Sequence, residues 1–224
     1  MTTDSPTCAQ CMIKIPVRRC MREDGKAPSN CPTECKPEVL AKTLKEYERP
    51  EIQEFARQAS IQEGEGYGDK GLEGRPVRPI KPRIVETIEF AKRMGYERLG
   101  FVFCIGLQRE AQAVEKILAS KDFQVISVAC KVGCAPKETI GVQDDQKIRP
   151  GSFESMCNPI MQANVLNEAR TELNVLLGLC VGHDSLVLKY SDALCTVLAA
   201  KDRLLGHNPL AAIYNLESYY RYLK

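Results

Sequence analysis

FVFC (Phe101–Cys104) is one of three short apolar runs that end in a cysteine, and these runs decide the fold. The other two are VISVAC (Val125–Cys130) and VLLGLC (Val175–Cys180). A glycine follows each run within three residues, and longer segments with helical spacing separate the runs. Uninterrupted apolar runs of this length, alternating with helices, are typical of the buried strands of a parallel sheet.

The segment that begins at Pro82 continues this alternation to the end of the chain. We expect strands at 99–104, 123–130, 173–180 and 193–199. We expect helices at 82–95, 107–120, 158–172 and 184–190, and a last helix from Pro209 to Tyr220. This order predicts an α/β fold, with a parallel sheet of four or more strands and helices on both faces in a Rossmann-like three-layer arrangement.

In such a sheet, Cys104, Cys130 and Cys180 lie at the carboxyl edge, where open α/β sheets bind their ligands. Cys157 opens a helix in Met-Cys-Asn-Pro, so it is expected to face the same edge. A single strand-end cysteine is usually a small buried hydrophobic residue. Its recurrence on three strands, with a fourth thiol nearby, favours a ligand set for a metal or an iron–sulfur cluster.

A helix is expected to begin soon after Cys104 and soon after Cys180, and the amino terminus of a helix favours thiolate. If only three of the four cysteines bind a cluster, one iron stays open as a Lewis acid. His183 and Asp184 are then candidate acid–base residues. For His183, and for His207 after the fourth strand, a turn residue that hydrogen-bonds the backbone explains the pattern as well as a functional role does.

Other polar residues at the same edge allow two interpretations. Lys201-Asp202-Arg203 could hold an anion or form a salt-bridged turn, and the turn is favoured. Lys131 and Lys137 could face an anionic substrate or only solvent. The connection 131–153 is long enough to be a functional loop.

The amino-terminal residues 1–36 contain five cysteines but few periodic apolar residues, so they cannot bury a core. A metal bound by four thiolates would hold this segment together. The expected ligands are Cys8, Cys11, Cys20 and Cys31, with Cys35 as the spare. A structural zinc is slightly favoured over a second iron–sulfur cluster. Cys134 is either a fifth thiol at the sheet edge or a loop residue, and Cys195 is assigned to the core at the fourth strand.

The pattern divides the 224 residues into three parts. They are a cysteine-rich module at 1–36, a helical segment and linker at 37–81, and the α/β domain at 82–224. Residues 37–62 are expected to form one or two helices, broken or kinked at Pro50. Residues 63–83 are expected to form a loop rich in glycine and proline.

Composition restricts the function. Lys and Arg exceed Asp and Glu by two, which does not suggest nucleic-acid binding. The polar amino terminus and the lack of a long apolar run indicate neither a signal peptide nor a membrane span. Eleven cysteines in a chain expected to be cytoplasmic favour metal or redox chemistry over structural disulfides.

Several motifs carry a resemblance to a known family: CIGLQREA (104–111), ACKVG (129–133), MCNPIMQANVLNEA (156–169), GLCVGHDSL (178–186) and KDRLLGHNPLAAIY (201–214). With CAQC (8–11), Cys20 and NCPT (30–33), they resemble the prokaryotic predicted metal-binding proteins catalogued as domain of unknown function 1847. The resemblance covers nearly the whole chain and implies a cytoplasmic protein, typically from anaerobes, with cysteine-bound metal. The family motifs include Cys104, Cys130, Cys157 and Cys180, whereas Cys35, Cys134 and Cys195 lie outside them.

The leading hypothesis is therefore an iron–sulfur protein. Its cluster, of the four-iron type, is expected at the sheet edge, where it would serve redox, sulfur or Lewis-acid chemistry on a small molecule or with an electron-transfer partner. The alternative is a non-catalytic zinc protein with a structural or storage role. A thiol–disulfide redox protein ranks last, because the α/β domain has no C-x-x-C at the start of a helix.

Overall fold

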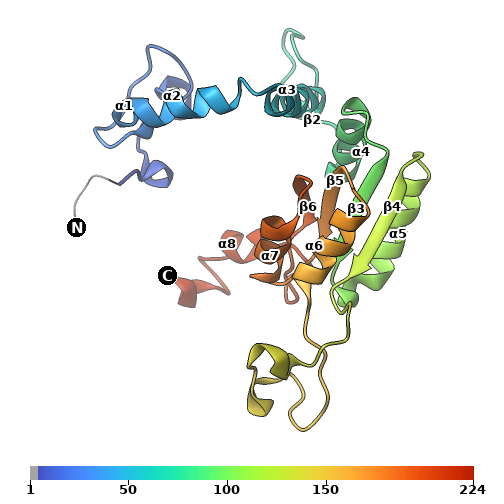
Figure 1. Ribbon diagram of the computed structural model, residues 1–224. Helices are drawn as coiled ribbons and strands as arrows, with labels where there is room; N and C mark the ends of the chain where they lie inside the picture. The colour runs from blue at the N-terminus through green and yellow to red at the C-terminus, as the bar shows by residue number, and fades with distance from the viewer. Residues whose placement is uncertain (1–4) are drawn as a thin grey trace. The chain divides into compact units, whose positions relative to one another are not determined.

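The computed structural model describes residues 5–224, and the chain divides into two compact units at the boundary between Ile61 and Gln62 (Figure 1). The boundaries at 36 and 81 that the composition suggests stay a prediction.

The second unit contains a four-stranded parallel sheet. Its strands are β3 (Arg98–Phe103), β4 (Gln124–Ala129), β5 (Leu173–Leu177) and β6 (Cys195–Ala199), in the spatial order β4-β3-β5-β6. The predicted α/β class with a four-stranded parallel sheet is confirmed. From β3 the chain first proceeds to β4 on one side and then returns to β5 on the other. The gap between β3 and β5 is therefore the topological switch point.

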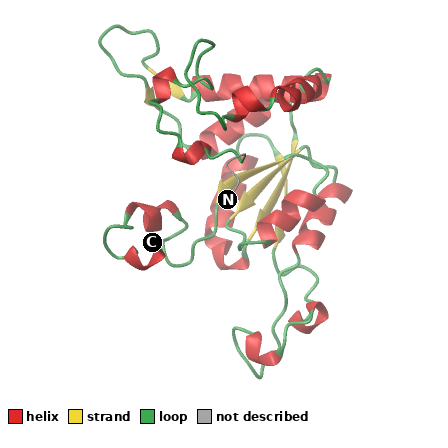
Figure 2. Ribbon diagram, turned by 90° about the vertical axis from the view of Figure 1, so that its left-hand side faces the viewer, coloured by secondary structure: helices red, strands yellow, loops and turns green. Residues whose placement is uncertain are grey.

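Helices cover both faces of this sheet (Figure 2). They are α4 (Arg83–Arg93), α5 (Gln108–Ala119), α6 (Pro159–Glu168) and α7 (His183–Tyr190). Side chains alternate along β3, so Phe101 and Phe103 pack on the face with residues of α5. Val102 and Cys104 pack on the opposite face, against residues of α6 and α7. Cys104 thus forms part of the core as well as the sheet edge.

Two expected helices are shorter than the sequence pattern suggests. Helix α6 ends at Glu168, because Arg170 turns the backbone to a φ of 51° and Thr171 N–H bonds back to the Leu166 carbonyl. Helix α8 covers only Leu210–Tyr214, and a 3₁₀ turn follows at Arg221–Leu223. Most of the apolar side chains of α8 are exposed, so packing does not extend it.

The first unit is built from short elements and has no fully buried residue among 5–61. Two 3₁₀ turns, Cys8–Gln10 and Ile15–Val17, precede α1 (Pro32–Cys35), α2 (Pro37–Glu46) and α3 (Pro50–Glu65). The helix break predicted at Pro50 is confirmed, since Pro50 is the first residue of α3.

Two connections have more structure than expected. Within 63–83, β1 (Tyr67–Gly68) pairs antiparallel with β2 (Arg78–Pro79), so this segment is not only a loop. The 131–156 loop contains two 3₁₀ turns, Lys137–Ile140 and Asp144–Gln146. A third such turn, Ile105–Leu107, joins β3 to α5. Among the described residues no helix has the length and apolar character needed to cross a bilayer.

Candidate functional site

Cys104 and Cys130 each stand directly after a strand at the carboxyl edge. Cys104 follows β3, and its N–H still donates to the Leu177 carbonyl at 3.2 Å. Cys130 follows β4, and its N–H donates to the Phe103 carbonyl at 2.9 Å. The sheet ladder therefore fixes both backbones, and the side chains are 8% and 2% exposed.

Cys157 reaches the same edge from the amino-terminal side of α6. The N–H of Asn158 donates to the Cys130 carbonyl at 2.8 Å, and the Asn158 side chain caps α6 by accepting from the Met161 N–H at 3.1 Å. The Cys130 thiol hydrogen-bonds with both Cys104 and Cys157. We call these three residues the thiol cluster.

The three residues of the thiol cluster differ in pKa. Hydrogen bonding to Cys104 and Cys157, together with burial, raises the pKa of Cys130, so its thiol keeps the proton and donates it. The hydrogen bond from Cys130 lowers the pKa of Cys104 to about 4. The same donor, with help from Lys131 and His183, lowers the pKa of Cys157 to about 6 against the opposing effect of burial. These shifts favour the thiolate form of Cys104 and Cys157.

Backbone and side-chain donors add to this stabilisation. The N–H of Ile105 lies 3.3 Å from Cys130 Sγ, and the N–H of Gly106 bonds to Cys104. Lys201 Nζ lies 3.1 Å from Cys104 Sγ. A Cβ on Gly106 would lie 3.6 Å from Lys201 Nζ, an ordinary van der Waals distance.

Cys180 belongs to the same edge but differs from the thiol cluster. It lies three residues beyond the end of β5, not at the strand end as expected. Its hydrogen bond comes from Arg203 Nη2 at 2.8 Å, whereas its interactions with Cys104 and Cys157 are electrostatic. Burial raises the pKa of Cys180 and outweighs the opposing effect of the Arg203 charge.

The predicted acid–base residues stand at the start of α7. The N–H groups of His183 and Asp184 donate to the Cys180 carbonyl at 2.9 and 3.3 Å. His183 also interacts electrostatically with Cys157. The Asp184 carboxylate accepts from the Ser185 N–H at 2.8 Å within the first turn of α7.

The segment after β6 differs from the salt-bridged turn that the sequence favoured. The Asp202 carboxylate accepts from the N–H groups of Leu204 and Leu205 at 3.0 and 2.8 Å. His207 Nδ1 accepts from the Asp202 N–H at 3.2 Å, which is the plain turn role. Because the turn is closed in this way, Lys201 and Arg203 are free to point at Cys104 and Cys180.

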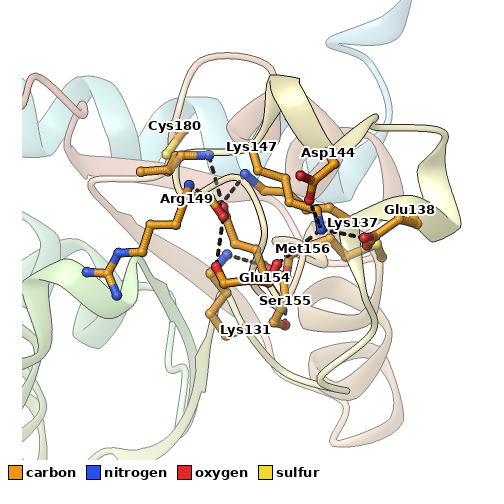
Figure 3. A network of polar contacts seen from close by, with 12 residues as sticks. Lys131, Lys137, Glu138, Asp144, Lys147, Arg149, Glu154, Ser155, Met156 and Cys180 are labelled. Atoms are coloured by element: carbon orange, nitrogen blue, oxygen red, sulfur yellow. Dashed lines mark hydrogen bonds and ion pairs between the residues drawn. The ribbon is translucent and has the colours of Figure 1, made fainter.

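The 131–156 loop extends beyond this edge and is held by its own polar network (Figure 3). Glu154 pairs with Lys137 and accepts from the Ile148 N–H at 2.9 Å. Lys147, with only 4% of its side chain exposed, pairs with Glu138 and Asp144. Lys131 and Lys137 thus contact the Ser155 carbonyl and Glu154. The network orders the chain that leads into Cys157.

A cavity of about 120 Å³ lies in the first unit. All four expected metal ligands line it, Cys8, Cys11, Cys20 and Cys31, whereas the spare Cys35 does not. Arg18, Arg19 and Lys26 line the same cavity and supply positive charge. Arg18 also bonds to the Cys11 carbonyl at 2.9 Å.

All eleven cysteines are free thiols. Over residues 5–224, no group of three or more His, Cys, Asp or Glu side chains adopts the arrangement of a metal-binding group. The thiols gather at two places without forming a coordination shell. Cys134 is exposed in the loop, with a φ of 48°, and Cys195 is the first residue of β6, as expected for the two cysteines set aside.

The comparisons with known proteins agree with the resemblance. The family described as a protein of unknown function (DUF1847) matches residues 31–198. The chain belongs to this family. An uncharacterized protein of Methanocaldococcus jannaschii is 42% identical over 181 residues, which cover 81% of this chain and 86% of that protein. No solved structure matches this chain. These descriptions state no activity, so function must be argued from the site.

Sequence reasoning placed Lys201 and Arg203 at this edge but did not predict their contacts with Cys104 and Cys180. Their place directly after the fourth strand was the available signal, since this strand ends at the same edge as the other three. Their contacts depend on the Asp202 turn, which local sequence does not reveal.

Proposed function

We propose that the carboxyl edge of the sheet binds a thiophilic metal centre, an iron–sulfur cluster of the four-iron type, through three or four of the residues Cys104, Cys130, Cys157 and Cys180. The observation that carries this proposal is the thiol cluster, in which three thiols from separate segments meet. Two of them are held as thiolates, the form that ligates metals.

The surrounding residues suit such a centre. When bound, a cluster supplies one-electron transfer or, at an open iron, Lewis acidity. Lys201 and Arg203 place positive charge beside Cys104 and Cys180 and offset the negative charge of a thiolate-ligated group. The Ile105 and Gly106 N–H groups supply donors to sulfur. His183 interacts electrostatically with Cys157.

The first unit supports a second metal site. Cys8, Cys11, Cys20 and Cys31 line one cavity, which favours this set over any that includes Cys35. Four thiolates suit zinc as well as a second cluster. A structural role fits the lack of buried residues in this unit.

Two other functions are alternatives that the experiment below distinguishes from the proposed one. A zinc protein with a structural or storage role would use the same thiols. A thiol–disulfide function is favoured by the hydrogen-bonded contact of Cys130 with two thiolates, although no C-x-x-C is present at this edge. Each function requires reduced thiols, so we infer a cytoplasmic location and a small-molecule or electron-transfer partner.

The test is anaerobic purification followed by measurement of iron, acid-labile sulfide and zinc per chain, with the visible spectrum. We expect about four irons with matching sulfide and a broad brown absorbance. Cys130→Ser should abolish the bound iron and sulfide and the brown absorbance. Cys195→Ser, which removes a free thiol from β6, should keep them. Zinc without sulfide would establish the zinc function. A metal-free protein that forms a disulfide among Cys104, Cys130 and Cys157 on mild oxidation would establish the thiol–disulfide function.

A further inference from the structure

The four thiols of the sheet edge are not equivalent. Cys104, Cys130 and Cys157 are linked through the Cys130 thiol. Main-chain hydrogen bonds from Cys104 to Leu177 and from Cys130 to Phe103 fix the strand ends beneath them. Cys180 stands outside this set, three residues beyond β5. The next residue, Val181, is 93% exposed, so this part of the connection borders solvent.

Cys180 has a cation as its partner. Arg203 Nη2 lies 2.8 Å from its sulfur, and Lys201 Nζ lies 3.1 Å from Cys104 Sγ. Both cations come from the same turn, which Asp202 and His207 close through hydrogen bonds to the main chain. The two charges are therefore held in place.

The position of these residues matches a ligand site in this class of fold. Cys104 follows β3 and Cys180 follows β5, so they flank the topological switch point of the sheet. Ligands of open α/β sheets bind outside the strand ends at this point. Two fixed cations at such a place favour an anion, because a guanidinium and an ammonium bind carboxylates through charge-assisted hydrogen bonds.

We propose that the thiol cluster alone holds the metal centre, and that Cys180, Lys201 and Arg203 form a binding site for a small carboxylate beside it. This inference rests on the proposed function. It makes Cys180 dispensable for assembly of the centre. It also assigns to Lys201 and Arg203 the recognition of the anion that binds beside the metal centre.

The first experiment compares single cysteine variants of the full chain, prepared without oxygen and loaded with iron and sulfide. We expect Cys104→Ser, Cys130→Ser and Cys157→Ser to lose the cluster. Cys180→Ser should keep at least half of the iron and sulfide of the parent protein, as should the control Cys195→Ser. Loss of the cluster in Cys180→Ser, to the level of the other three, would overturn this inference and leave the proposed function intact. Absence of a cluster from the parent protein would instead overturn the proposed function.

The second experiment measures binding of malonate, a small dicarboxylate, to the loaded protein by anaerobic calorimetry. Lys201→Met and Arg203→Met should each weaken the Kd for malonate at least tenfold, with the affinity taken per cluster-loaded chain in each variant. The control is Lys121→Met, which removes an exposed lysine before β4, at the opposite edge of the sheet. Equal malonate affinity in all three variants, or no binding to the parent, would overturn the anion site.

Discussion

Cys130 controls the chemistry of the site at the scale of a single residue. It is the most buried thiol of the cluster, and it keeps its proton, so that its single S–H is the donor shared by Cys104 and Cys157. Two thiolates side by side would repel each other in a partly buried site, so a protonated thiol between them lowers the cost of holding both. In a metal-free protein the central thiol therefore decides how reactive its neighbours are.

Replacement of Cys130 by alanine tests this role. Cys157 has a pKa of about 6 because Cys130 donates to it, so the loss of the donor should move the pKa of Cys157 toward its ordinary value of 9.0. The thiolate is the nucleophile, and a higher pKa leaves less of it at acidic pH. Alkylation of Cys157 by iodoacetamide at pH 6 should then slow by about tenfold or more in the reduced, metal-free protein.

Peptide mass spectrometry over a range of pH gives the midpoint for each cysteine. Cys130→Ser is the matched control, because its hydroxyl can still donate a hydrogen bond, and the midpoint should shift less than in Cys130→Ala. An identical pH profile for Cys157 in the parent and in Cys130→Ala would show that another group holds the thiolate.

At the scale of elements, the connection from β5 to α7 places Cys180. Two glycines flank it, Gly178 with a φ of 61° and Gly182 with a φ of 83°, a region of backbone conformation that favours glycine. Their surroundings differ. A Cβ on Gly178 would stand 2.1 Å from Leu107 Cδ1, in the core, whereas a Cβ on Gly182 would meet no atom within 4 Å.

This difference makes the two glycines a matched pair. Gly182→Ala should lower the free energy of unfolding by about 1–2 kcal/mol, the cost of a left-handed residue with a side chain. Gly178→Ala adds the clash with Leu107 and should cost about 2–4 kcal/mol. Urea unfolding of the metal-free protein measures both. Equal losses would mean that Leu107 moves aside without cost.

The same element scale shows what the sequence predicts and what it does not. The ends of β3 and β4 were placed within one residue of the strand bounds, because apolar runs that stop at a break mark a buried strand directly. The end of β5 was placed at Cys180, because Gly178 and Leu179 continue the apolar run although the sheet pairing stops at Leu177. The thiol cluster follows from these strand ends and from the cap of α6.

Long-range polar contacts could not be predicted from local sequence patterns. Lys201 hydrogen-bonds to Cys104, which is 97 positions away in the sequence. Lys137 forms an ion pair with Glu154 within a loop whose composition indicates only that it is polar. Such pairs depend on how the chain returns to the sheet edge and on turns such as the one that Asp202 closes. The charge of Lys201 was visible in the sequence, but its partner was not.

At the scale of the whole molecule, the two units depend on their thiols in different ways. The second unit has two apolar cores, one on each face of its sheet, so it does not need a metal to fold. The first unit has no fully buried residue among 5–61, and its cavity is lined by four cysteines. Such a unit has little hydrophobic stabilisation, and metal binding would supply the missing free energy.

Metal removal should therefore unfold one unit and spare the other. A chelator strong enough to strip zinc should raise amide exchange of residues 5–36 at least tenfold, while β3 and β5 keep their protection. Cys20→Ser should reproduce this effect without a chelator, because Cys20 lines the cavity, whereas Cys35→Ser should not, because Cys35 lies outside it. Hydrogen exchange followed by mass spectrometry measures both regions in one experiment. Unchanged exchange at 5–36 after complete loss of metal would show that the short helices and turns hold this unit together by themselves.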